Sequence, residues 1–237
     1  MKINKKTILL ATLLFLLSVI AILNTIYTPK TVTKAEKNTN SVIPKKISVQ
    51  SKKERFYALL VPAVEKAYKE LETEYFAAKK LVATNPNGPK ITMLIKKYSA
   101  KDPQDLLTRM KPHPRSIALA QSAMESAWGT SRFFKIANNI FGVWSFNKNE
   151  PRIPAGKKRG NKTIYVKKYA TITDSIRDYY KILSTGKAFQ AFREEKMKTD
   201  DPYKLVQYLD KYSERGDDYG KELANMIRHN HLTKYDK

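Results

Sequence analysis

The chain has 237 residues, 42% of them hydrophobic and 11% aromatic, so it can form one folded domain with extensions and is not disordered throughout. Lysine and arginine number 45 against 22 acidic residues, giving a formal net charge of +23. This charge predicts a polyanionic partner, which could be nucleic acid, an acidic lipid surface or a carboxylate-bearing polymer. The absence of cysteine excludes disulfides, cysteine-ligated metals and thiol nucleophiles.

Histidine is also scarce, with only His113, His229 and His231 in the chain. No HExxH or GxSxG motif occurs, and the last two histidines are two residues apart, which places them on different faces of a helix. We therefore expect no metal site built on histidine, and a Ser–His–acid triad would need one of these three residues.

The N-terminus carries the features of a membrane segment. Three lysines precede an uncharged apolar run, Thr7 to Tyr27, which is about long enough to cross a hydrocarbon core. The exit from this run, NTIYTP, is a poor cleavage site, and the lysines should stay in the cytoplasm. We expect residues 1–27 to anchor the protein in the inner membrane, with the rest exported to the periplasmic face; cleaved secretion is the alternative.

Residues 28–51 are basic and rich in Thr, Lys, Asn and Ser, without a helical period, and we interpret them as a linker. From Lys52 onward, apolar residues recur at three- and four-residue steps, which predicts a helix that Pro62 kinks. A break at residues 85–89 separates it from a helix at about 91–98, and Asp102 caps the next one.

The remaining chain is predicted to be helical apart from one segment. Pro114 opens a helix that Gly129 ends. Residues 141–171 contain Pro and Gly and end in the alternating TIYVKKYAT, which predicts a hairpin or small β lobe. Further helices are expected from residue 173, and at about 188–197, 203–212 and 218–228. Residues 52–237 should thus form one mainly α domain, a helical core with a small β-hairpin lobe.

Glu125 is the candidate general acid. On the predicted helix at 115–128 it shares a face with Gln121, Met124 and Trp128. A carboxyl on such an apolar stripe is partly desolvated, and desolvation raises its pKa toward the value that a general acid needs at neutral pH. The alternative is a solvated or ion-paired glutamate at the edge of the stripe.

Two motifs follow Glu125 directly. One is WGTS, beginning at Trp128, and the other is ANNIFG, which contains Asn138 and Asn139. Neighbouring asparagines beside aromatic residues offer amide groups next to flat apolar faces, and sugars present the same mixture of polar groups and apolar ring faces.

The segments QSAMESAWGTSRF and ANNIFGVW together resemble the helix–glutamate–hairpin region of the lysozyme-like endo-β-N-acetylglucosaminidases of glycoside hydrolase family 73, which cleave peptidoglycan. The block YSERGDDYGKELANMIRHNHL resembles the Bax branch of that family. The resemblance covers the chain from about Lys52 to its end. It implies a lysozyme-like α+β fold, cleavage of β-1,4 bonds in peptidoglycan strands and no cofactor, and we expect a monomer.

The resemblance also implies roles for individual residues. Glu125 matches the glutamate that protonates the glycosidic oxygen, and Tyr212 matches a tyrosine close to the reacting sugar, although packing in a helical core is an alternative for Tyr212. The substrate-binding residues would be Trp128, Asn139, Phe141, Gly142 and Tyr169. Asp178 and Tyr179 match a helix after the hairpin, where we expect a structural role.

One departure affects the mechanism. Many relatives carry a second carboxylate on the hairpin, where this chain has Gly156, and Glu150 is the only acid between Glu125 and Asp174. Two-carboxylate mechanisms need groups about 5–9.5 Å apart. Either Glu150 is a catalytic residue, or the 2-acetamido group of the substrate attacks its own anomeric carbon. We favour the second route.

Two other classes of function remain. A non-catalytic peptidoglycan-binding or assembly protein is favoured by the missing hairpin carboxylate and opposed by the retained Glu125 and its neighbours. A nucleic-acid binder is suggested by charge alone, but the cations are dispersed, the RNP, KH and zinc-finger patterns are absent, and the chain is expected to be exported. The expected partners are therefore peptidoglycan and the inner membrane, and not nucleic acid.

Overall fold

The structure, a computed structural model, describes residues 48–237 apart from the side chains of residues 157–159. The predicted membrane segment, 1–27, and nearly all of the predicted linker, 28–51, lie outside the described residues. No helix within residues 48–237 combines the length and the apolar character needed to cross a membrane.

The described chain is mainly α-helical with one two-stranded antiparallel sheet, so the predicted fold class is confirmed. The elements before the sheet are α2 (Val49–Thr84), α3 (Pro89–Tyr98), α4 (Pro103–Met110), α5 (Arg115–Glu125) and α6 (Arg132–Ala137). The sheet consists of β1 (Arg152–Arg159) and β2 (Lys162–Lys167). It is followed by α7 (Ile172–Thr185), η1 (Lys187–Phe189), α8 (Gln190–Glu195), α9 (Pro202–Leu205), η2 (Val206–Tyr212), α10 (Asp217–His229) and η3 (Leu232–Tyr235), where η marks a 3-10 helix.

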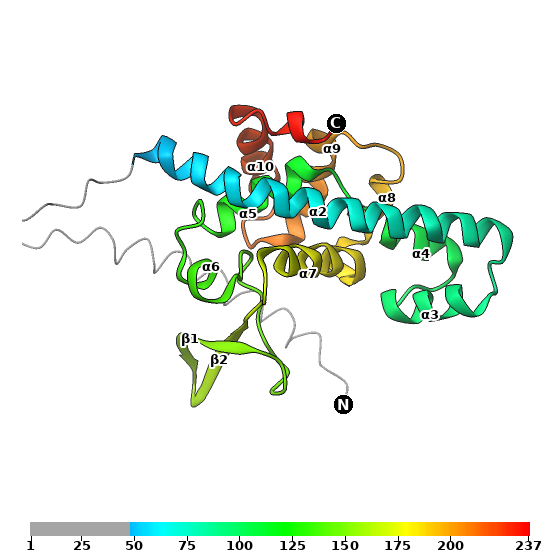
Figure 1. The fold of residues 1–237 in the computed structure, drawn as a ribbon, viewed down its shortest axis with the longest axis horizontal. Helices are drawn as coiled ribbons and strands as arrows, with labels where there is room; N and C mark the ends of the chain where they lie inside the picture. Colours follow the sequence, from blue (N-terminus) through cyan, green and yellow to red (C-terminus); the bar gives the residue numbers. More distant parts are fainter. Residues whose placement is uncertain (1–47) are drawn as a thin grey trace, which may run out of the picture.

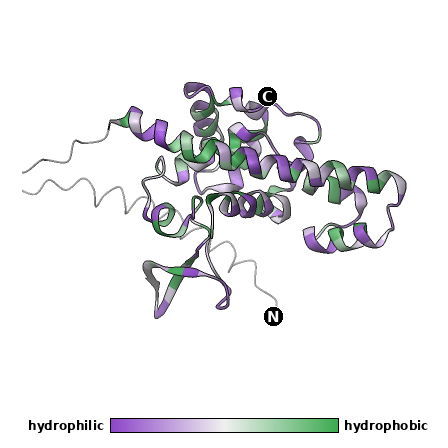
Figure 2. Cartoon of the chain, in the orientation of Figure 1, coloured by the Kyte–Doolittle hydropathy of each residue, from purple (hydrophilic) through white to green (hydrophobic). Residues whose placement is uncertain are grey.

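Helix α2 runs the length of the described molecule (Figure 1). The Ser48 side chain caps it by accepting a bond from the Ser51 amide, and the helix continues through the exposed Pro62 as one element. Apolar and polar residues alternate along it (Figure 2), and its buried residues recur at helical spacing. This pattern gives α2 one face toward the core.

The hydrophobic core has two parts along α2. The first half of α2 packs with α5, α7 and α10 around Phe56, Ile117 and Tyr219. The second half packs with α3 and α4 around Tyr75 and Leu106, at the end of the molecule farthest from the sheet (Figure 1). The larger core holds the elements that position the candidate active site.

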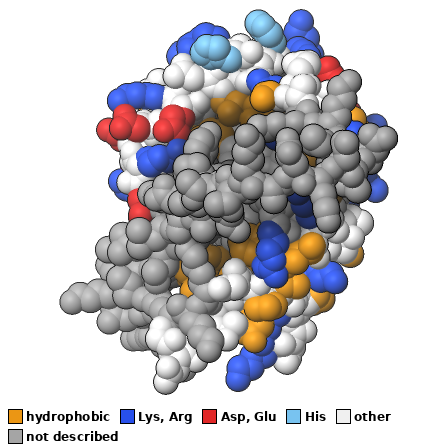
Figure 3. All heavy atoms as spheres, turned by 90° about the vertical axis from the view of Figure 1, so that its left-hand side faces the viewer, with side chains coloured by type: hydrophobic (Ala, Val, Ile, Leu, Met, Phe, Trp, Pro, Cys, Tyr) orange, Lys and Arg blue, Asp and Glu red, His pale blue; other side chains and the backbone are white. Residues whose placement is uncertain are grey.

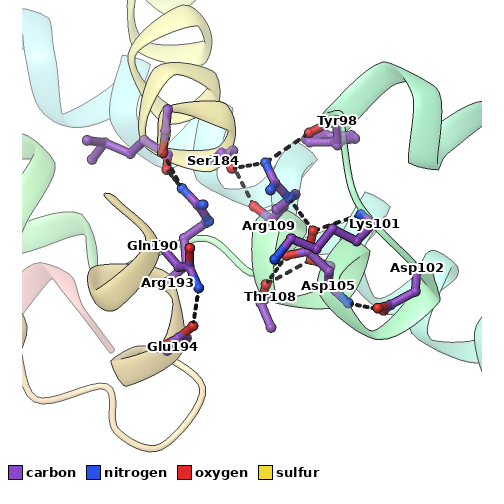
Figure 4. A network of polar contacts seen from close by, with 12 residues as sticks. Tyr98, Lys101, Asp102, Asp105, Thr108, Arg109, Ser184, Gln190, Arg193 and Glu194 are labelled. Carbon is purple, nitrogen blue, oxygen red and sulfur yellow. Dashed lines mark hydrogen bonds and ion pairs between the residues drawn. The ribbon is translucent and has the colours of Figure 1, made fainter. Parts of the chain in front are cut away.

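A buried arginine links the smaller core to α7. Arg109 of α4 is 8% exposed, pairs with Asp105 at 2.8 Å, and donates to the backbone oxygens of Tyr98 and Ser184 (Figure 4). Arg193 of α8 donates to the carbonyls of Leu183 and Gly186. The two guanidinium groups therefore supply donors to carbonyls at the C-terminal end of α7, which the helix itself leaves without partners.

The sheet forms a hairpin that projects from the helical body (Figure 1). Arg152 pairs with Lys167 and Arg159 with Lys162, and a register shift lies between Pro154 and Lys158. The predicted hairpin in residues 141–171 is thus confirmed.

Three predicted helices differ in the structure. The helix predicted to reach Gly129 ends at Glu125, because Ala127 and Trp128 adopt left-handed φ angles of 49° and 59°. The helix predicted at 188–197 is η1 followed by α8, and the one predicted at 203–212 is α9 followed by η2. Apolar spacing alone does not distinguish one α-helix from short α and 3-10 segments in succession.

Candidate active site

Helix α5 delivers Glu125 to the surface from inside the protein. Residues 116–123 of this helix are all buried, and most are Ala or Ser, which allows other helices to approach closely on every side. Glu125 is its last residue and is partly exposed. The carboxyl therefore stands at the point where a buried helix reaches the solvent.

The WGTS motif forms the turn that ends α5. The Ser126 hydroxyl donates to the Ser122 carbonyl and accepts a bond from the Gly129 amide. Ala127, Trp128 and Gly129 are consecutive left-handed residues, a conformation that is costly for residues other than glycine. This turn reverses the chain directly after Glu125.

The sequence predicted that Trp128 shares the helical face of Glu125, and the structure shows that it does not. Its ring packs edge-on against Phe56 and Tyr57 of α2, with centroids 5.4 and 5.8 Å away, and the Lys53 ammonium lies 4.7 Å from its centre. The prediction was wrong because it assumed that the helix continues for three more residues. The turn directs Trp128 to α2.

A directed hydrogen-bond chain ends on Glu125. The Tyr219 hydroxyl of α10 donates to Glu125 Oε1 at 3.0 Å and accepts a bond from Gln121 Nε2 at 2.9 Å. Gln121 Oε1 in turn accepts a bond from the Tyr179 hydroxyl of α7. Gln121, Tyr179 and Tyr219 are all buried, so the chain fixes one side of the carboxyl through three helices.

The pKa of Glu125 is raised from its ordinary 4.5 to about 7. Burial is the main cause, because it disfavours the charged form, while the bond from Tyr219 and the charge of Arg215 act in the opposite direction. The position at the C-terminus of α5, where backbone carbonyls point outward, also disfavours a carboxylate. A carboxyl with this pKa can be protonated near neutral pH and still release its proton.

Tyr212 lies beside this chain. Its ring stacks on that of Tyr219 with centroids 5.5 Å apart and planes at 10°, and it is partly exposed. Burial, followed by the charge of Glu125, raises the pKa of Tyr212, so the hydroxyl stays protonated near neutral pH. Tyr212 thus lies close to Glu125 with its hydroxyl available as a donor.

The predicted saccharide-binding asparagine occupies a structural position. Asn139 is buried, and its amide nitrogen donates to the carbonyls of Val143 and Lys167 while its oxygen accepts a bond from the Val143 amide. These bonds hold the segment after α6 against β2. Asn138 similarly donates to the Tyr169 carbonyl.

Phe141 and Gly142 follow these asparagines. Phe141 is 3% exposed and stacks on Tyr179 at 4.1 Å, which places it in the core beneath the hydrogen-bond chain. Gly142 is partly exposed and adopts a φ of 63°, a backbone conformation that favours glycine.

A second polar group lies at the base of the hairpin. The Tyr169 hydroxyl donates to Asp178 Oδ2 at 2.7 Å, and Lys167 Nζ lies 2.8 Å from the same oxygen. Glu150 accepts a bond from the Ser145 hydroxyl and lies 3.9 Å from Lys167. Tyr169 and Glu150 therefore belong to one cluster. Glu150 takes no part in the hydrogen-bond chain that ends on Glu125.

The structure brings Tyr219 and Arg215 to Glu125, although the sequence predicted a role for neither of them. The available signal was the second tyrosine of YSERGDDY, which spacing alone could not favour over Tyr212. Asp178 was expected to be structural, yet it lines the pocket at the hairpin base. No group of His, Asp and Glu side chains within residues 48–237 could hold a metal ion.

Several known proteins are similar to this chain. The Bax protein of Escherichia coli strain K12 is 28% identical over 131 residues, covering 53% of this chain and 46% of that protein, so the chain spans about half the length of this relative. The catalytic domain of the autolysin Auto from Listeria monocytogenes has 20% identity and a TM-score of 0.46, over 87% of this chain and 100% of that domain. A peptidoglycan hydrolase from Sphingomonas sp. A1 has 18% identity and a TM-score of 0.42, over 60% of this chain and 91% of its own.

A family model carries the assignment. The glucosaminidase model, described as mannosyl-glycoprotein endo-beta-N-acetylglucosaminidase, matches residues 100–232. This range includes Glu125, the hairpin and both tyrosines of the C-terminal block. Because the match covers more than half of the 237 residues, the chain belongs to the glucosaminidase family.

Proposed function

We propose that this protein hydrolyses β-1,4 glycosidic bonds of peptidoglycan as an endo-β-N-acetylglucosaminidase, with Glu125 as the general acid. The observation that carries the proposal is the Glu125 carboxyl, whose pKa is raised to about 7 and whose Oε1 atom accepts a bond from Tyr219. Membership of the glucosaminidase family supports the same reaction class.

The hydrogen-bond chain orients the acid. The Tyr219 hydroxyl donates to Oε1 and its own oxygen accepts a bond from Gln121, so the proton of neutral Glu125 resides on Oε2. Oε2 gives this proton to the glycosidic oxygen as the bond to the anomeric carbon breaks. The carboxylate that remains is stabilised by the Tyr219 hydroxyl and the Arg215 cation.

Substrate assistance accounts best for the attack on the anomeric carbon. The acetamido oxygen attacks this carbon as the leaving group departs, and water then opens the cyclic intermediate with Glu125 as the base. Glu150 supports this choice because its carboxyl is held by Ser145 and Lys167 in the cluster of Tyr169 and Asp178. Tyr212 is the residue that we expect to bind the acetamido group.

The charge of the chain suits this substrate. Peptidoglycan peptides carry carboxylates, and the face drawn in Figure 3 has lysine and arginine side chains spread across it rather than gathered in one patch. Such attraction is long-ranged and is screened by salt. We propose that the protein acts outside the cytoplasm, attached to the inner membrane through residues 1–27.

A non-catalytic peptidoglycan-binding protein is the second candidate, and Gly156 favours it. The family resemblance implies that many relatives have a carboxylate at this place on the hairpin, whereas Gly156 supplies no side chain and nothing lies within 4 Å of the space a Cβ would occupy. Such a protein would bind wall polymer without releasing fragments.

One experiment separates these functions. The full chain and Glu125→Gln are incubated with purified peptidoglycan, and the released reducing ends are identified by mass spectrometry. Fragments ending in reducing N-acetylglucosamine that disappear in the variant support the proposal. Reducing N-acetylmuramic acid would indicate a muramidase, and intact wall binding without fragments would support the non-catalytic candidate.

A further inference from the structure

We propose that the pocket between the hairpin base and α7 binds the carboxylate groups of a peptide attached to the glycan strand. The inference rests on the proposed function, because it names a second part of the same substrate. It adds a site for the peptide to the site for the sugar.

The pocket has a volume of about 420 Å³. Its wall is formed by the end of β2 and the residue pair after it, together with the exposed side of α7. Its charged lining residues are Lys167, Lys168, Arg177 and Lys181, together with the carboxylates Glu150, Asp174 and Asp178. A volume of this size falls in the range that accommodates a small ligand or a short peptide.

The charges of the pocket divide into paired and unpaired groups. Lys167 pairs with Asp178 at 2.8 Å, and Arg177 pairs with Glu70 and Asp174 at 2.6 and 2.7 Å.

Lys168 and Lys181 are exposed and form no ion pair within residues 48–237. The lining residues carry four cations and three carboxylates, so the pocket wall has a net charge of +1. Lys168 and Lys181 are the two lining cations that no carboxylate of these residues pairs with, and they can bind a ligand. An anionic ligand is therefore preferred.

The floor of the pocket is fixed in place. Asp178 Oδ2 receives both the Tyr169 hydroxyl and the Lys167 ammonium, which holds the Tyr169 ring at the rim. Burial and this bond are the main causes that raise the pKa of Tyr169, followed by the charges of Asp178, Glu150 and Tyr212. Tyr169 lines the pocket and is near enough to Tyr212 to be affected by its charge, and Tyr212 stacks on the tyrosine bonded to Glu125.

This arrangement fits the chemistry of peptidoglycan. The polymer carries peptides as branches on its sugars, and these peptides present several carboxylates at a short distance from the glycan backbone. Two unpaired ammonium groups close to the proposed sugar site match such a branch. A bare glycan strand offers nothing that would occupy them.

The first test measures binding of a synthetic stem peptide to the full chain by isothermal titration calorimetry. The variant is Lys168→Glu with Lys181→Glu, and the control is Lys79→Glu with Lys80→Glu, which makes the same charge change at the far end of α2 (Figure 1). All four lysines are exposed, so folding should persist in both variants. We expect the pocket variant to bind about tenfold more weakly and the control to bind like the wild type.

Two results would overturn the inference. One is equal affinity in the wild type and the pocket variant, and the other is equal affinity for the peptide and for a copy whose carboxylates are converted to amides. Failure of the wild type to bind the peptide at any accessible concentration would have the same meaning.

A parallel measurement keeps the inference separate from the proposed function. Cleavage of peptide-bearing strands is compared with cleavage of strands from which the peptides have been removed. We expect the pocket variant to lose activity on the first substrate and to match the wild type on the second. Absence of cleavage on both substrates, with peptide binding retained, would contradict the proposed function and leave the pocket assignment standing.

Discussion

The Tyr219 hydroxyl lies 3.0 Å from Glu125 Oε1, although the two residues are 94 positions apart in the chain. Helix α10 thus completes the environment of a carboxyl that α5 presents. The bond holds one oxygen of Glu125 and lowers its pKa, while burial raises that pKa more strongly. The balance of these effects produces an acid suited to neutral pH.

Glu125→Gln should abolish cleavage and stabilise the protein at alkaline pH. Folding raises the pKa of Glu125 from 4.5 to about 7, so the folded protein binds more protons than the unfolded chain between these pH values. The free energy of unfolding of the wild type therefore falls as pH rises through this window. The free energy of unfolding of the variant should exceed that of the wild type by about 1–3 kcal/mol at pH 8. The difference should vanish near pH 4.

Urea denaturation at the two pH values checks this prediction. Glu65→Gln, at an exposed position of α2, is the matched control and should show no such difference. A Glu125→Gln variant that is equally stable relative to the wild type at both pH values would contradict a raised pKa.

Tyr219→Phe should shift the pH dependence of cleavage upward. The activity of a general acid declines as pH rises through its pKa, so the wild type should lose activity above about pH 7. Removing the Tyr219 hydroxyl removes a bond that favours the carboxylate, which raises the pKa of Glu125 and moves the decline to higher pH. The profile of kcat/KM against pH measures the shift.

The same substitution leaves Gln121 Nε2 buried without its acceptor and should cost about 1–3 kcal/mol of stability. Tyr208→Phe, at an exposed tyrosine of η2, is the control for both effects. If the kcat/KM of Tyr219→Phe declines at the same pH as that of the wild type, the bond from Tyr219 does not alter the pKa of Glu125.

Glu150→Gln should reduce kcat by less than about tenfold, because a group outside the reacting atoms contributes mainly through positioning. Its carboxyl accepts a bond from Ser145, and the glutamine oxygen can accept the same bond. Steady-state kinetics on purified peptidoglycan provide the measurement. A loss of about a thousandfold, the size seen when a reacting group is removed, would instead assign Glu150 to catalysis.

Lys196→Met should stabilise the protein at neutral and acidic pH. Lys196 is 3% exposed, and burial, followed by the charges of Arg193 and Lys111, lowers its pKa from 10.5 to about 7. The unfolded chain therefore binds more protons between these values, and wild-type stability rises with pH across that window. Removing the amine should add about 1–3 kcal/mol below pH 7.

That advantage should shrink as pH rises from about 7 and disappear above pH 10.5, where the amine is neutral in both states. Thermal unfolding at pH 6 and pH 10 measures it, with the exposed Lys204→Met as control. A variant less stable than the wild type at pH 6 would mean that the bond from Lys196 to the Lys111 carbonyl outweighs the cost of burying the charge.

Much of the fold could be predicted because its signals are local. Asp102 and Pro103 start α4, and Thr171 and Asp174 form a capping box at the start of α7. The alternation in residues 163–171 predicted β2, and the spacing of apolar residues predicted the first helix. Each of these patterns depends on neighbours within a few residues.

Local patterns predicted less of the candidate site than of the fold. Glu125 could be singled out because its helix carries it on an apolar stripe, but Trp128 was misplaced because a left-handed turn intervenes. Asn139 was expected to meet the substrate, whereas its amide is used by the backbone of Val143 and Lys167. The residue type predicted hydrogen bonding correctly and did not specify the partner.

Local patterns were sufficient to predict most of the helices, several of their caps, the hairpin and the residue types of a glycosidase-like site, because hydrophobic period and backbone preference act over short distances. Which groups meet depends on the tertiary fold. It placed Tyr219 on Glu125, Asp178 beneath Tyr169, and Lys196 in the interior. These contacts set the pKa values and the pocket charge, since desolvation and Coulomb interactions depend on distance in space rather than along the chain.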